Sequence, residues 1–164
     1  MNITNTLRWI HILAGAAWLG EVVVVNFILV PILARLEPEK RGWFLAAIFP
    51  RIFRMASILS LTTILAGAAL NLSLNGWQID VAVVRLTSSR WGWSILMGGL
   101  LGLGLTLFHF VAEHRLEPHV VAAYEESDSE AFALILRRLQ IIPRAGLGVL
   151  VLTFLLMMFA VRGL

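Results

Sequence analysis

The sequence predicts an all-α integral membrane protein, a four-helix bundle whose helices cross the bilayer up, down, up and down. Apolar residues make up 59% of the 164 residues and charged residues only 14%, whereas a soluble domain of this size carries roughly 25% charge. Four apolar runs are each long enough to cross a membrane, which takes about 20 residues. Because lipid offers no hydrogen bonds to a backbone, each run is expected to be a helix.

The four runs fill the chain, so we expect one membrane domain over residues 1–164 with no separate soluble domain. The first run is too long for a signal peptide and is therefore interpreted as the first span. Cysteine is absent, which excludes disulfides, thiolate catalysis and cysteine-bound metal sites. The expected spans are 5–34, 50–74, 91–113 and 139–161.

The basic residues predict the orientation of these spans. They gather at span ends, which is typical of the positive-inside rule and not of nucleic-acid binding, although the isoelectric point is about 10.6. Nine of the thirteen lie in or beside the first and third connections. Those connections are therefore expected to be cytoplasmic and both termini extracytoplasmic, in a membrane of the bacterial cytoplasmic type. The four on the opposite side are Arg8, Arg85, Arg90 and Arg162.

The three connections are expected to differ in structure. Pro38 and Pro50 bracket a short stretch of the first, which predicts a brief interfacial helix there. Asn75 and Gly76 predict a turn at the start of the second. The third, roughly 113–138, is the most polar segment and is expected to be an acidic loop followed by a helix start.

One titratable ring lies near the beginning of the first span, in "RWIHILAGAAWLG". Because a helix turns about 100° per residue, Gly15 and Trp18 share the face of His11. Gly15 leaves a flat space beside the ring of the kind that a planar macrocycle needs, and imidazole is a common axial ligand of haem iron. A packed, hydrogen-bonded histidine is the alternative interpretation of the same pattern.

The segment "HILAGAAWLG", with His, six residues, Trp, one residue and Gly, resembles the first helix of CopD-like copper-resistance membrane proteins and of HemJ-type protoporphyrinogen oxidases. "FPRIFRMASILSLTTILAGAALN" and "RWGWSILMGGLLGLGLTLFHF" resemble the second and third helices of CopD-like proteins. The resemblance covers most of the chain. It implies a four-helix bundle that holds haem b with His11 as an axial ligand. The implied activity is electron transfer, or oxidation of a small substrate or quinone.

The chain departs from those families at one position, because they carry a lysine near the start of the third helix where Met97 stands here. Methionine can ligate haem iron, so His11 and Met97 form a possible axial pair, while apolar packing is the alternative for Met97. With Arg8 and Arg90 set at one depth, Met97 lies about 6 Å deeper than His11, whereas His109 lies about 24 Å deeper. The two arginines are also candidates to face haem propionates, or simply to snorkel to the interface.

Glu21 falls near the bilayer midplane by the same measure. A carboxyl group there is expected to be protonated or paired, and intramembrane acids are candidates for function by default. Glu21 is therefore the candidate catalytic residue, which could relay protons to a redox centre or bind a cation. The alternative is a protonated side chain bonded to a Ser, Thr or Asn of another helix.

His109 and Glu113 are four residues apart and share a helical face, which suits two metal ligands, with His119 as a further candidate. A polar cytoplasmic helix end is the alternative. Function therefore stays open between a haem protein, a transport or resistance protein for copper or another metal, and a small subunit or assembly factor of a respiratory complex. The expected partners are the lipid bilayer, a quinone or redox protein, and further subunits of the same or other chains, but no nucleic acid.

Overall fold

The computed structural model describes residues 2–125 and 129–162, and this part of the chain contains helices and turns but no strand. Within it, four helices are long and apolar enough to cross a membrane. The prediction of an all-helical chain with four such helices is confirmed, and it indicates a multi-pass membrane protein. The four are Ile3–Arg35, Lys40–Leu74, Arg90–Arg115 and Ile141–Ala160.

The first of these helices contains a short π-helical segment. α1 (Ile3–Val24) leads into η1 (Val25–Leu29), where the N–H of Val30 bonds to the carbonyl of Val25, and then into α2 (Val30–Arg35). Pro31 follows directly and has no N–H to donate, so the regular bonding pattern changes at one place along the helix. Such π-segments are frequently found at functional sites.

The first connection is much shorter than predicted. α3 (Pro38–Leu74) continues through Pro50 without a break, so the expected interfacial helix is instead the first part of α3. Pro38 stands at the start of the helix, where its missing N–H would have no partner in any case. Only Leu36 and Glu37 separate α2 from α3.

An arginine of α3 closes this connection. The guanidinium of Arg41 donates hydrogen bonds to the carbonyls of Leu36 (2.8 Å) and Ala34 (3.4 Å). These carbonyls lie at the end of α2, where a helix leaves such groups without internal partners. Arg41 therefore joins the end of the first span to the start of the second.

The second connection confirms the predicted turn and adds a helix. Gly76 and Trp77 both have positive φ values, 63° and 64°, and the turn leads into α4 (Ile79–Thr87). In the third connection the expected loop is largely wrong, because α5 (Arg90–Glu125) and α6 (Ser129–Arg162) both extend into it. The segment is polar but rich in Ala, Leu, Glu and Arg, which are strong helix formers.

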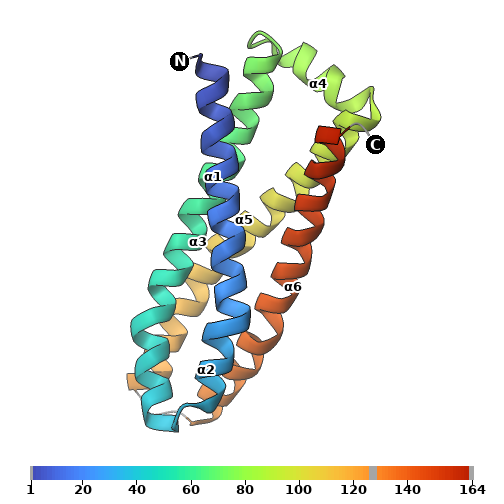
Figure 1. The fold of residues 1–164 in the computed structure, drawn as a ribbon. Coiled ribbons are helices and arrows are strands. Elements are labelled where there is room, and N and C mark those ends of the chain that lie inside the picture. The colour runs from blue at the N-terminus through green and yellow to red at the C-terminus, as the bar shows by residue number, and fades with distance from the viewer. Residues whose placement is uncertain (1, 126–128, 163–164) are drawn as a thin grey trace.

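The long helices pack as two antiparallel pairs. α1 lies mainly on α3 and α5 mainly on α6, while contacts between α3 and α5 join the pairs (Figure 1). The start of α1 and the end of α6 lie at the same end of the bundle, beside α4 (Figure 1). One buried apolar cluster unites Trp18, Val22, Leu105 and Leu150, and a second, of Leu33, Leu45 and Phe49, lies near the first connection.

Glycines allow close approach where helices meet. A Cβ atom added at Gly98 would lie 2.9 Å from the Met157 side chain of α6, and one at Gly102 would lie 3.0 Å from Ile64 of α3. These two glycines, spaced four apart, therefore allow close packing against two different helices. At Gly92 the neighbour is backbone, because an added Cβ would lie 2.3 Å from the Arg85 carbonyl oxygen.

We expect Gly92→Ala to destabilise the protein by about 1–3 kcal/mol, the usual range for overpacking, because the α4 backbone cannot yield as a flexible side chain can. Gly99→Ala is the matched control on the same helix, since a Cβ there meets nothing within 4 Å. Thermal unfolding of the purified variants in detergent measures both. Equal midpoints for the two variants would contradict the close approach at Gly92.

Candidate functional site

The centre of the bundle contains four polar side chains, here named the buried polar layer: the buried Trp18, Glu21 and Ser57, and the half-buried His109. Trp18 is only 1% exposed, Ser57 3% and Glu21 8%. The indole of Trp18 meets the imidazole of His109 edge to face, with ring centroids 5.8 Å apart. The layer therefore draws side chains from α1, α3 and α5, whereas the buried hydroxyls of Ser60, Thr63, Thr106 and Thr153 bond to carbonyls of their own helices.

Contacts between helices set these residues at one level. Across the α1–α3 pair, Thr4 contacts Ser73 and His11 contacts Thr63, so the part of α3 opposite Glu21 lies within about one turn of Ser57. Across the α3–α5 pair, Ile64 lies against the position of Gly102. Because the two helices are antiparallel, Ser57, seven residues before Ile64, lies level with His109, seven residues after Gly102. The ring contact between Trp18 and His109 independently shows that these parts of α1 and α5 lie at the same level.

Each member of the layer has a polar atom without a hydrogen-bond partner among the described residues. These atoms are the Trp18 Nε1, the Glu21 Oε2, the Ser57 Oγ and the His109 Nδ1. Burying one such group without a partner costs on the order of 1–3 kcal/mol in proteins. Native structures therefore contain few of them, and a cluster in one layer is a functional candidate.

Asn26 lies on η1, just beyond Glu21 along the first span. Its amide nitrogen donates to the carbonyl of Val22 at 2.8 Å and to the carbonyl of Pro143 in α6 at 2.9 Å. The first bond stays within the distorted part of the helix and the second ties it to α6. Asn26 therefore holds the π-segment against the opposite pair of helices.

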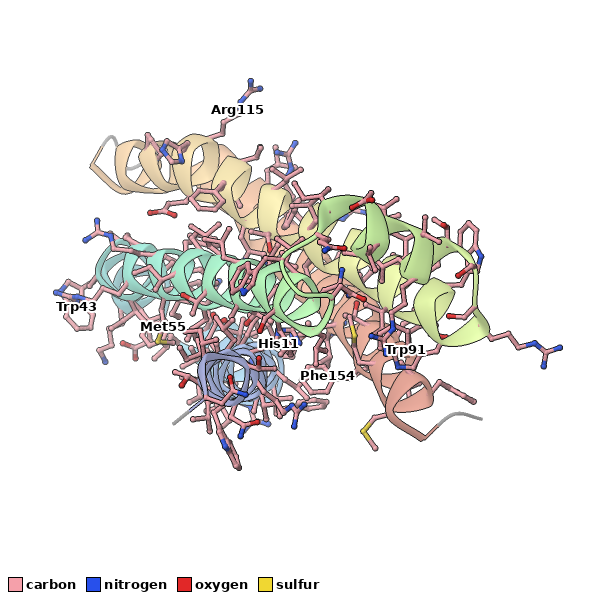
Figure 2. The ribbon with its side chains drawn as sticks, turned by 90° about the horizontal axis from the view of Figure 1, so that it is seen from above. His11, Trp43, Met55, Trp91, Arg115 and Phe154 are labelled. Atoms are coloured by element: carbon pink, nitrogen blue, oxygen red, sulfur yellow. The ribbon has the colours of Figure 1, made fainter. Side chains whose placement is uncertain are left out.

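His11 lies apart from the buried polar layer, between α1 and α3 (Figure 2). Its Nδ1 is 2.8 Å from the carbonyl oxygen of Thr63. A Cβ atom added at Gly67 would lie 2.8 Å from the ring, so the ring occupies the space that this glycine leaves. The neighbouring candidate Gly15 faces Thr63 and Phe154, with added-Cβ distances of 3.5 and 3.8 Å.

The other candidates for cofactor binding are spread over the surface. Met97 is 44% exposed on the outward side of α5, and Arg8 and Arg90 are exposed at the starts of their helices. The structure thus does not gather these three around His11. Trp18, the remaining candidate, belongs to the buried polar layer.

The depth estimate from the sequence is wrong for His109. Setting Arg8 and Arg90 at one depth makes His109 about 13 Å deeper than Trp18, and Glu21 about 9 Å shallower than His109. The ring contact instead sets His109 beside Trp18. The estimate fails because α5 crosses the bundle obliquely, so its length overstates its depth (Figure 1).

The proposed metal pair lies on α5 as expected, with Glu113 one turn beyond His109. His109 packs against Trp18 and Phe108, while Glu113 is half-buried. The side chain of His119 lies outside those that the structure describes. Among the described residues, no group of three or more His, Asp or Glu side chains is placed to hold one metal ion.

Two polar residues of the interior, Ser57 and Asn26, are absent from the sequence-based candidates. Asn26 carries a signal that could have found it, since it is a lone amide in "VVVVNFILVP", five residues before a proline. Ser57 carries none, because serine is common in membrane helices and usually bonds to its own backbone. Thr63, Thr106 and Thr153 do so here.

Fold and site together define a multi-pass membrane protein with a polar layer buried between its helices. Comparison of the chain with protein-family models, with curated proteins and with solved structures gives no match.

We expect Asn26→Leu to destabilise the protein by about 0.6–1.7 kcal/mol, the range measured for hydrogen bonds between membrane helices. The variant keeps a similar volume but loses the bond to the carbonyl of Pro143. Asn5→Leu is the control, because Asn5 is exposed near the start of α1. Denaturant unfolding in mixed micelles compares the two, and an Asn26→Leu variant as stable as wild type would show that the bond contributes nothing.

Proposed function

We propose that this protein is an integral membrane haem b protein that transfers electrons, with His11 as an axial ligand of the iron. The observation that carries the proposal is the bond between the His11 Nδ1 and the Thr63 carbonyl oxygen. Histidines that bind metal almost always donate their other ring N–H to a carbonyl, carboxylate or water, which fixes the tautomer and the ring orientation. With Nδ1 engaged in this way, Nε2 is the nitrogen left for a metal.

The residues around His11 fit one axial position. Thr63 orients the ring through its backbone carbonyl, and Gly67 provides the room in which the ring lies. Met97 does not fit the second position, because it faces outward from α5. We therefore propose a haem with one axial ligand from the interior of this chain and do not assign the second.

Bound haem iron would supply reversible one-electron chemistry, with a potential set by its axial ligand and by burial. The chain's own contribution is to hold and orient the His11 imidazole and to surround it with apolar helix. A quinone in the bilayer or a second redox protein is the proposed partner class. We rank this function ahead of metal transport and of a purely structural subunit because the orientation of His11 supports it specifically.

The proposal includes an orientation and a membrane. The excess of basic residues in the first and third connections supports four spans of alternating direction in a bacterial-type cytoplasmic membrane, with those connections in the cytoplasm. Both termini are then extracytoplasmic, and His11, near the N-terminal end of its span, lies toward the outer face.

Protein purified from haem-replete membranes should show a Soret band that shifts on reduction. His11→Ala should abolish the band, whereas His114→Ala should keep it, because His114 is exposed and is bonded to the Phe110 carbonyl of its own helix. Gly67→Ala should reduce haem content by crowding the His11 ring, while Gly104→Ala, where nothing lies within 4 Å, should not. A colourless wild type, or an unchanged band in His11→Ala, would overturn the proposal.

Reporter fusions test the orientation. Alkaline phosphatase is active only outside the cytoplasm, so we expect activity when it follows the C-terminus and little when it replaces the chain after Leu36. Green fluorescent protein at the same two positions should give the opposite pattern. Phosphatase activity at Leu36 together with fluorescence at the C-terminus would reverse the proposed orientation.

A further inference from the structure

We propose that the buried polar layer is a binding site for internal water, which bridges Glu21, Trp18, Ser57 and His109 inside the membrane-spanning bundle. The inference goes beyond the proposed haem function and does not depend on it, because no member of the layer contacts His11 in the described bonds. The proposed occupant is water, held beside the apolar cluster that packs around Trp18.

Four polar atoms of the layer lack a hydrogen-bond partner among the described residues. They come from three different helices, and the side chains of Trp18, Glu21 and Ser57 are each more than nine-tenths buried. A single unpartnered hydroxyl could be an accident of one rotamer, but four such atoms at one level of the bundle, two of them on rings in contact, favour a shared partner.

A shared partner of these atoms has to accept a hydrogen bond from one side chain and donate to another. The Trp18 Nε1 can only donate a hydrogen bond, whereas an ionised Glu21 Oε2 can only accept one. A bare cation satisfies acceptors alone and would face the indole N–H unfavourably. Water accepts from the indole and donates to the carboxyl, the hydroxyl or the imidazole. Buried waters typically make about three hydrogen bonds, in a range of two to four, to otherwise unsatisfied groups, and the four atoms of the layer fall within that range.

An apolar cluster surrounds the Trp18 side of the layer. Val22, Leu105 and Leu150 pack around Trp18, so water in the layer has no competing polar surface nearby in that cluster. On the side of the first connection, the amide nitrogen of Asn26 donates to the carbonyls of Val22 and Pro143, while its Oδ1 is a further buried atom without a partner among the described residues. Water held in the layer would therefore give the carboxyl of Glu21 a hydrogen-bond partner that the described side chains do not supply.

Magnetic resonance of the full chain in nanodiscs tests the inference directly. With all six tryptophans labelled at the indole nitrogen, the Trp18 signal is assigned by its disappearance in Trp18→Phe. We expect a cross-peak between the Trp18 indole proton and water, although this ring is the most buried. Exposed Trp77 and Trp93 give the reference cross-peaks.

Glu21→Leu removes the main polar partner at similar volume, and it should abolish the Trp18 cross-peak while the other five indole signals keep their positions. Glu113→Leu is the matched control, because this half-buried glutamate lies outside the layer. If Glu21→Leu does not fold, Ser57→Ala should weaken the same cross-peak.

Two results would overturn the proposal. One is a Trp18 indole in the wild type that shows no water cross-peak and is protected from exchange. The other is a direct hydrogen bond between Glu21 and His109, seen as a through-bond coupling or a short distance between the labelled side chains. A protein that lacks haem but shows the Trp18 cross-peak would refute the proposed function and leave this inference intact.

Discussion

Lipid supplies no hydrogen bonds, and most of this structure follows from that constraint. A backbone in the bilayer core must satisfy its own polar groups, so the chain forms helices that continue through Pro31, Pro50 and Pro143 instead of ending there. Each proline removes one N–H and leaves a carbonyl with less to bind. Polar side chains also bond to backbone carbonyls at other positions, as Asn26 does to the carbonyl of Pro143 and His11 to that of Thr63.

The same constraint explains which parts of the fold could be predicted. Long apolar runs can only be helices in lipid, so four of them were predictable from composition alone. The ends were not, because polar residues after a span are compatible with either a loop or a continued helix. Pro38 predicts the boundary of an interfacial helix, but a proline is equally well suited to the first turn of a long helix, and it stands there in α3. In the third connection, the helix propensity of the residues outweighs their polarity, so α5 and α6 extend into a segment where a loop is expected.

The candidate site was predicted residue by residue but not as an arrangement. The sequence identifies Glu21, Trp18 and His109 because titratable or aromatic groups stand out in apolar runs. It does not bring them together, because depth along a helix converts to depth in a membrane only when the tilt is known. Ser57 was missed for a different reason, since its burial depends on the helix that faces it and not on its neighbours in sequence.

The two-residue link between α2 and α3 has a mechanical consequence. With Leu36 and Glu37 as the only spacer, and with Arg41 of α3 bonded to the carbonyls of Ala34 and Leu36, the first two spans are held tightly together at one end. At the other end Thr4 and Ser73 hold them together. Because they are tied at both ends and packed along their length, we expect these two spans to move as one unit, so a rearrangement of the bundle would change their contacts with α5 and α6.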